Sequence, residues 1–271
     1  MRASIRLLAL TFLTAAGTLA AADGDIEALA QAHHLQLQFR QGNLQAVDPL
    51  VKGLETAVTR SPDNADLWEA LGNAYMSQQG TLFQSKANPA TLIAASERAQ
   101  AAYGRALTMD DKNALLLASH GMAGLVTAML KQDPAAMSLS IKEMNAAVLQ
   151  APRSTTVRLT RAFTTIHLPV AVRDTTAVID DLRFIMDTAP GGRPEDVLHV
   201  LLGDVYAETG DPAAARREYE LVTGASSFAA EQSRSRLNDL KTGAVSPAAI
   251  GLVRAGTGYG CVMCHAPGSD N

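Results

Sequence analysis

The stretch Trp68-Glu69-Ala70-Leu71-Gly72-Asn73-Ala74-Tyr75 decides the fold, because its spacing returns later in the chain. In the second copy, His199-Val200-Leu201-Leu202-Gly203-Asp204-Val205-Tyr206, a histidine replaces the tryptophan, while leucine, glycine and tyrosine keep their places. Residues three and four apart lie on one face of an α-helix, so each stretch predicts a helix with one packed face. The glycine lets a second helix approach closely, and the larger residues fill the seam between the two helices.

The spacing W-x2-L-G-x2-Y resembles the tetratricopeptide (TPR) repeat, a helical hairpin of about 34 residues. The second copy continues with Gly210, Ala215 and Tyr219, which extend the resemblance. One hairpin cannot bury its apolar face alone, so such hairpins stack into a solenoid. The resemblance therefore implies an all-α, TPR-like solenoid of helical hairpins. Abundant alanine and scarce β-branched runs favour helix as well.

Weaker copies of the pattern extend the predicted solenoid over residues 25–242. Proline ends a helix because it lacks an N–H and clashes with the preceding turn, and such stops follow apolar stretches at Ser61-Pro62, Ala151-Pro152 and Ala189-Pro190. We expect about five hairpins and then a capping helix. The hairpins are predicted at 25–60, 64–110, 113–151, 155–189 and 195–224, and the capping helix at about 228–240.

Two features depart from the repeat pattern. Arg158 and Arg161 stand where large apolar residues are expected. The second hairpin is also longer than the fifth, and its extra residues fall at 78–91, where Asn88 and Pro89 favour turns. This segment predicts a long loop, either a functional lip or a tolerated insertion.

Composition narrows the function classes. Of the 271 residues, 47% are hydrophobic and 18% are charged, so the chain can bury a core. A net charge of −4 gives no electrostatic reason to bind nucleic acid, and 4% aromatic residues argue against a base-stacking surface. The TPR resemblance instead implies protein partners, which we place on the concave face of the solenoid. No Gly-rich phosphate loop, G-x-S-x-G or H-E-x-x-H sequence occurs.

Residues 1–22 resemble a secretory signal peptide. Arg2 and Arg6 give a positive start, the run 7–13 is apolar, and small residues occupy 20–22. The apolar run is too short to span a bilayer, and we expect no stable membrane span elsewhere. A retained interfacial anchor is the alternative. The mature chain is therefore expected in the periplasm, an oxidising compartment.

The C-terminal tail, residues 243–271, carries the chemistry. Its sequence Cys261-Val262-Met263-Cys264-His265 contains both cysteines of the chain and matches C-x-x-C-H, the attachment signature of c-type haem. The two thiols would add to the haem vinyl groups, and His265 would be the proximal iron ligand. By composition alone, this arrangement arises in about 2 of 10,000 cases. The predicted cofactor is one covalent haem c.

The run from Gly260 to Pro267 is similar to bacterial c-type cytochromes around their haem site. Small cytochromes of that kind continue into helices that bury the haem and supply a methionine ligand, whereas here only six residues follow His265. The comparison implies that the solenoid or a partner protein covers the haem.

Three other interpretations of the cysteine pair remain open. The first is a plain Cys261–Cys264 disulfide in an oxidising compartment. A thioredoxin-like redox pair would need a strand before it and a helix after it, but a glycine-rich stretch precedes Cys261. A zinc site would need four ligands, and only three obvious ones are local.

The sixth iron ligand is not identified by the sequence. Among its candidates, His120 and His199 are expected in hairpin seams, and His33-His34 in solvent. The methionines are expected to fill the core. The full candidate set is His33, His34, His120, His167, His199, Met76, Met109, Met122, Met129, Met137, Met144 and Met186.

Together these features favour an exported single-haem c-type cytochrome on a TPR scaffold, which passes single electrons to a periplasmic partner. We expect a carrier or scaffold rather than an enzyme, with peroxidase-like chemistry as the enzymatic variant if the sixth position is open. The alternative function is a non-redox TPR adaptor that organises a periplasmic or envelope complex. In that case Cys261 and Cys264 form a disulfide.

Overall fold

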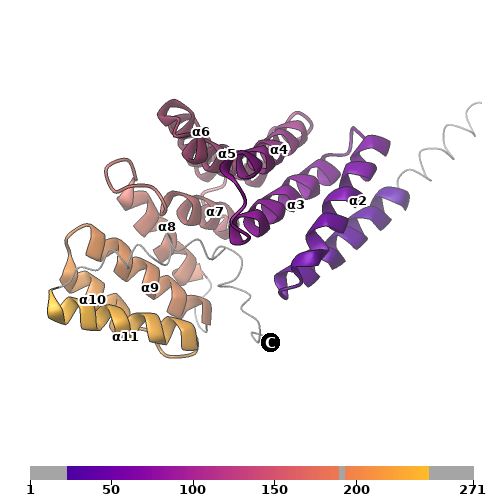
Figure 1. Ribbon diagram of the computed structural model, residues 1–271. Helices are drawn as coiled ribbons and strands as arrows, with labels where there is room; N and C mark the ends of the chain where they lie inside the picture. Colours follow the sequence, from indigo (N-terminus) through magenta and orange to yellow (C-terminus); the bar gives the residue numbers. More distant parts are fainter. Residues whose placement is uncertain (1–22, 189–192, 244–271) are drawn as a thin grey trace, which may run out of the picture.

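The structure is a computed structural model in which residues 23–188 and 193–243 are described. Within these ranges every regular element is a helix and none is a strand. The helices form consecutive antiparallel pairs, so the predicted all-α solenoid of helical hairpins is confirmed. Figure 1 shows the pairs following one another along an arc, from α2 on the right, over α4 to α6, to α9 to α11 at the lower left.

Five hairpins and one further helix make up the described chain, as predicted. The first hairpin joins a helix at 23–40 to α2 (Val47–Arg60) through the short 3₁₀ turn η1 (Leu44–Ala46). The next four pairs and the last helix are α3 (Ala65–Gln84) with α4 (Pro89–Leu107), α5 (Ala114–Lys131) with α6 (Pro134–Gln150), α7 (Thr155–Thr165) with α8 (Thr175–Thr188), α9 (Arg193–Glu208) with α10 (Pro212–Glu220), and α11 (Ser227–Thr242).

Polar side chains at the turns explain where the helices begin. The side chains of Asn64 and Asn113 each accept two backbone N–H groups at the starts of α3 and α5. Asp133 does the same at the start of α6, and Pro134 occupies the first turn, where a missing N–H costs nothing. Such a cap contributes about 1 kcal/mol to the helix that it starts.

The glycines of the two matching stretches hold their hairpins together at close range. A Cβ atom on Gly72 would lie 2.5 Å from the ring of Tyr103 in α4, and one on Gly203 would lie 2.3 Å from the ring of Tyr219 in α10. Both distances are too short for real atoms, so only glycine permits the approach. The packing predicted from the sequence at these two seams is confirmed.

The insertion at 78–91 lengthens helices and does not form a long loop. α3 has 20 residues and α4 has 19, against 16 in α9 and 9 in α10. Gly80 lies inside α3, and the turn is confined to 85–88, where Asn88 caps α4. The expectation of a loop was wrong because Gly80 is tolerated within a helix whose neighbours pack along its length.

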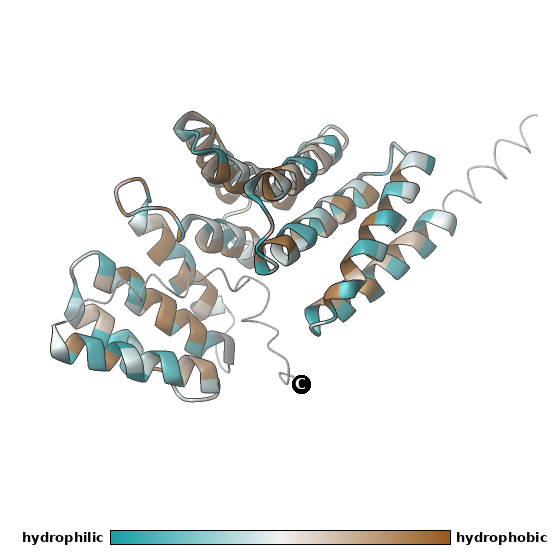
Figure 2. Ribbon diagram, viewed as in Figure 1, coloured by the Kyte–Doolittle hydropathy of each residue, from teal (hydrophilic) through white to brown (hydrophobic). Residues whose placement is uncertain are grey.

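The core runs along the seams between helices. One cluster joins the helix at 23–40 with α2, α3, α4 and α5 around Leu54, Leu67 and Tyr103, and another joins α7, α8, α9 and α11 around Leu182 and Leu202. In Figure 2 hydrophobic residues gather where α9 meets its neighbours, while α11 is mainly hydrophilic. α11 buries only Ala229, Ser233 and Arg236, in line with the predicted capping role.

α5 is the one described helix that is long and apolar enough to cross a membrane by length and composition. More than half of its most apolar window is buried inside the protein. It packs against α4 on one side and α6 on the other. These contacts are those of a core helix of the solenoid.

Candidate functional site

The predicted haem-binding residues Cys261, Cys264 and His265 lie outside the described residues, as does the predicted signal peptide at 1–22. What the structure does show is the body from which the tail departs. α11 ends at Thr242, and Gly243 stops it with a left-handed φ of 70°. The described candidates for chemistry therefore all lie in the solenoid.

Two of the candidate histidines lie in hairpin seams, as predicted. His199 on α9 places Nδ1 2.9 Å from Glu218 Oε2 on α10, and its side chain is 12% exposed. His120 on α5 places Nδ1 2.8 Å from Glu143 Oε2 on α6. In both hairpins the imidazole therefore links the two helices through a carboxylate.

The other three candidate histidines are exposed. His33 and His34 lie on the outer face of the first helix, where Nε2 of His34 is 2.9 Å from the side-chain nitrogen of Gln38. His167 follows the end of α7 and is exposed as well. The predicted solvent exposure of His33 and His34 is confirmed.

Six of the seven candidate methionines pack in or against the core, as predicted, whereas Met109 is partly exposed and belongs to none of the core clusters. Met144 is completely buried, and it packs with Leu125 and Leu168. Three further methionines of α5 and α6 lie half-buried against this group: Met122, Met129 and Met137. Met76 and Met186 pack at the margins of the two large clusters.

The two arginines that break the repeat pattern share one buried acid. Asp181 on α8 is 0% exposed and accepts hydrogen bonds from Arg158 Nη1 at 2.6 Å and from Arg161 Nε at 2.7 Å. The guanidinium of Arg158 also lies over the ring of Phe184, 4.4 Å from its centroid. Charged residues fit at these seam positions because the facing helix supplies the opposite charge.

Sequence reasoning missed that this pairing recurs. Glu143, Asp181 and Glu218 each pair with a basic or imidazole side chain on the preceding helix. Each also stands directly before a buried residue of its own helix, namely Met144, Leu182 or Tyr219. The second hairpin has Ala102 at this place, before Tyr103. An acid in that register, with a base on the helix before it, is the signal that could have revealed the pairs.

The fifth hairpin is joined to α11 by a buried network. Asp204 accepts a hydrogen bond from the Tyr219 hydroxyl at 2.7 Å and two from the guanidinium of Arg236, including one from Nη2 at 3.1 Å. Burial raises the pKa of Asp204 to about 6, while Arg236 and Tyr219 act against the rise. Burial and the neighbouring Asp204 carboxylate raise the pKa of Tyr219 well above its usual value. These hydrogen bonds hold α11, the capping helix, against the fifth hairpin.

A second carboxylate ties the turn before α11 to α9. Asp196 is 1% exposed and accepts hydrogen bonds from the backbone N–H groups of Thr223, Gly224 and Ser226 and from the Thr223 hydroxyl. Burial alone would raise the pKa of Asp196, but these hydrogen bonds favour the charged form and lower it below the usual range. The Asp196 carboxylate is therefore engaged in hydrogen bonds that stabilise the fold.

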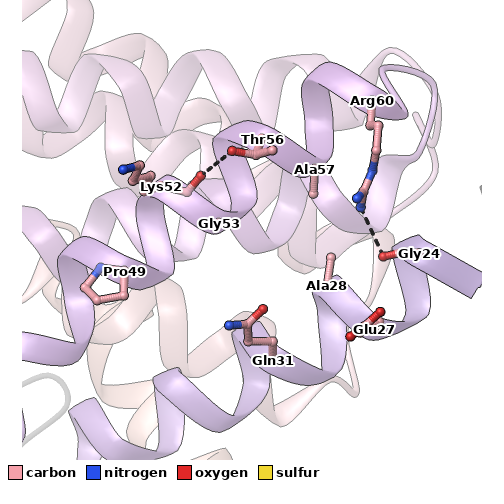
Figure 3. Close-up of a pocket in the computed structure, with 10 residues that line it drawn as sticks. All are labelled: Gly24, Glu27, Ala28, Gln31, Pro49, Lys52, Gly53, Thr56, Ala57 and Arg60. Atoms are coloured by element: carbon pink, nitrogen blue, oxygen red, sulfur yellow. Dashed lines mark hydrogen bonds between the residues drawn. The ribbon is translucent and has the colours of Figure 1, made fainter.

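A groove of about 530 Å³ lies between the first helix and α2. Figure 3 shows its polar side chains, with Glu27 and Gln31 on the first helix and Lys52 on α2, well apart from Glu27. Arg60 crosses the groove and donates a hydrogen bond to the Gly24 carbonyl at 3.1 Å. The groove is open, and its charged groups do not converge on one point as a catalytic constellation would.

Among the described residues, no group of three or more histidine, cysteine, aspartate or glutamate side chains is placed to hold a metal ion. No protein-family model and no curated protein sequence matches the chain. The candidate functional site therefore remains the predicted C-x-x-C-H sequence, which lies in the tail that follows the solenoid.

Proposed function

We propose that the protein is an exported single-haem electron carrier, in which a TPR-like solenoid bears a haem-binding C-terminal tail. The observation that carries this proposal is the sequence Cys261-Val262-Met263-Cys264-His265 in a chain with two cysteines in all. Two thiols and an adjacent imidazole are the donor set that covalent haem attachment requires. When bound, the haem supplies one-electron transfer, with a potential set by its axial ligands and exposure.

Five carboxylates of the solenoid are engaged in contacts within the fold, and this supports the proposal. The seam carboxylates Glu143, Asp181 and Glu218 are each paired, and Asp196 and Asp204 are buried in hydrogen-bond networks. A group held in this way stabilises the fold and offers no free acid or base to a substrate. We therefore assign the solenoid to positioning and partner binding, with protein partners on its concave face, and the tail to electron transfer.

The visible spectrum of the mature protein, produced with a c-type haem maturation system, tests the function. We expect a Soret band that shifts reversibly when the protein is reduced by dithionite and reoxidised by ferricyanide. Cys261→Ser/Cys264→Ser is expected to abolish the band, and His265→Ala to keep the haem but change the spectrum, because His265 is the proposed iron ligand and not an attachment point.

A protein that is colourless in all of these preparations would overturn the redox assignment. The adaptor function would then take its place, with Cys261 and Cys264 as a disulfide and the solenoid as a platform for a periplasmic or envelope complex. The single observation favouring that alternative is the export-like N-terminus, since a close cysteine pair in an oxidising compartment readily forms a disulfide.

A further inference from the structure

The loop between α7 and α8 exposes an unbroken apolar run. Pro169, Val170, Ala171 and Val172 are all exposed, with Val170 at 44% and Val172 at 58%. Four consecutive exposed apolar residues are unfavourable on the surface of a soluble protein unless they serve a function. The run therefore needs an explanation beyond loop connection.

Hydrogen bonds and buried side chains hold this loop in place. The backbone N–H groups of Val172 and Arg173 both donate to the Pro169 carbonyl, at 2.9 and 3.0 Å. The Arg173 side chain is 2% exposed, and it donates to the Ile166 carbonyl at 2.9 Å and to the Glu208 carboxylate at the end of α9. Leu168 is buried against the methionines of α5 and α6. These contacts fix the residues on both sides of the apolar run, so the run itself stays exposed.

α11, after which the C-terminal tail begins, ends at the same edge. α9 and α11 run parallel, because Asp196 contacts Ser226 at their starts and Asp204 contacts Arg236 farther along. The end of α11 at Thr242 therefore lies at the Glu208 end of α9, which Arg173 of the loop contacts. Figure 1 shows the α7–α8 loop and the α9–α10 turn at the same left-hand edge of the molecule.

The first residues of the tail suit an apolar surface. Residues 244–253 include Val245, Ile250, Leu252 and Val253 and contain no charged side chain. Packed helices lie about 8–10 Å apart and an extended chain covers about 3.3 Å per residue, so about six residues, 243–248, bridge two layers, from α11 past α9 to α7. Ile250, Leu252 and Val253 thus come within reach of the loop.

We propose that residues 249–253 of this chain dock on the exposed run Pro169–Val172 of the α7–α8 loop. Burial of apolar side chains on both partners drives the contact. Docking would fix the origin of the segment that leads to Cys261, so that the predicted haem site is presented at this edge of the solenoid. The contact itself requires neither haem nor a disulfide.

Amide hydrogen exchange on the mature full-length chain tests the contact. In the Cys261→Ser/Cys264→Ser form, which binds no haem, we expect the amides of 249–253 to exchange at least about 10-fold more slowly than in the free peptide. Val170→Asp/Val172→Asp should return them to within about twofold of the free rate. Leu149→Asp is the matched control, because Leu149 is 82% exposed near the end of α6, where Gln150 contacts the α4–α5 turn at the opposite edge.

Exchange of 249–253 at the free-peptide rate in the parent protein would overturn the proposal. Protection that survives Val170→Asp/Val172→Asp would do so equally, since the occupant would then lie elsewhere. The amides of α8 and α9 report in the same experiment whether the variant is folded. Because the measurement uses haem-free protein, its failure is distinct from failure of the haem proposal.

Discussion

The second and fifth hairpins solve the same packing problem in different ways. Both press a tyrosine ring onto a glycine, and both tyrosine hydroxyls donate to the residue after that glycine, Asn73 at 2.8 Å or Asp204 at 2.7 Å. They differ four residues before the glycine. Trp68 donates from Nε1 to the Pro62 carbonyl at 2.8 Å, whereas His199 faces Glu218 on the partner helix.

The fourth hairpin combines the two arrangements, the hydrogen bond to a proline carbonyl and the pair with an acid on the partner helix. Arg158 occupies the Trp68 place, donates from Nε to the Pro152 carbonyl at 2.8 Å as Trp68 does to Pro62, and also pairs with Asp181. The helix spacing is set by a small residue, and the flanking seam position accepts either an aromatic ring or a charge pair. The comparison teaches that the repeat fixes a geometry and leaves the chemistry of this position free.

The largest effect is expected at the buried acid of the fourth hairpin. Asp181→Ala leaves Arg158 and Arg161 without their partner inside the seam, so it should lower the free energy of unfolding by about 3 kcal/mol. The triple change Arg158→Leu/Arg161→Leu/Asp181→Leu removes all the charges together and should cost far less. Urea unfolding followed by helical circular dichroism measures both. Equal losses in the two variants would contradict the paired-charge account.

A smaller loss is expected at the glycines that the two hairpins share. Gly203→Ala and Gly72→Ala place a methyl carbon 2.3 Å and 2.5 Å, respectively, from a ring atom of a buried tyrosine, so each should cost about 2 kcal/mol. Gly53→Ala in α2 is the control, because no atom lies within 4 Å of the added Cβ, and it should stabilise by about 0.5–1 kcal/mol. If all three substitutions change the free energy of unfolding in the same direction, the seams at Gly72 and Gly203 are not tightly packed.

A pH dependence separates the fifth hairpin from the second. The pKa of Asp204 rises from 3.8 to about 6, so between these values the folded protein binds a proton more readily than the unfolded chain. The stability that this group contributes is present below about pH 4 and is lost as the pH rises through about 6. Comparing urea midpoints of the parent and Asp204→Asn from pH 4 to 7 isolates it. Midpoints that move in parallel would refute the assignment.

The smallest effect is expected at Trp68. Trp68→Phe keeps an aromatic ring but removes the donor to Pro62, so it should cost about 0.5–1.5 kcal/mol, the net value of one hydrogen bond. His199→Phe is the matching change in the fifth hairpin, and it should cost more because Glu218 loses its partner in the seam. The same unfolding measurement ranks the two. A larger loss for Trp68→Phe would reverse the comparison.

Much of the fold could be predicted from residues with strong local meaning. Gly72 and Gly203 mark seams because only glycine tolerates the facing ring, and Pro62 and Pro152 mark helix ends because proline has no N–H. The shape of the 78–91 insertion could not be predicted, since Gly80 and Pro89 are compatible with both loop and helix until the neighbouring helix is placed.

The seam pairs were hidden for a related physical reason. Arg158 and Asp181 lie in different helices, and a charge looks misplaced in a seam until its partner is known. The haem prediction, in contrast, depends on the short sequence Cys261–His265 alone, because thiol attachment and iron ligation need only that spacing. It stays a prediction, since those residues lie outside the described ranges.

We propose that this solenoid carries a covalently bound haem on its tail. The intact mass of the mature protein, produced with a c-type maturation system and measured after denaturation, tests it most directly. We predict a gain of about 616 Da over the polypeptide, one haem joined through Cys261 and Cys264. A mass about 2 Da below that of the reduced polypeptide, the loss of two hydrogens in a disulfide, would contradict it.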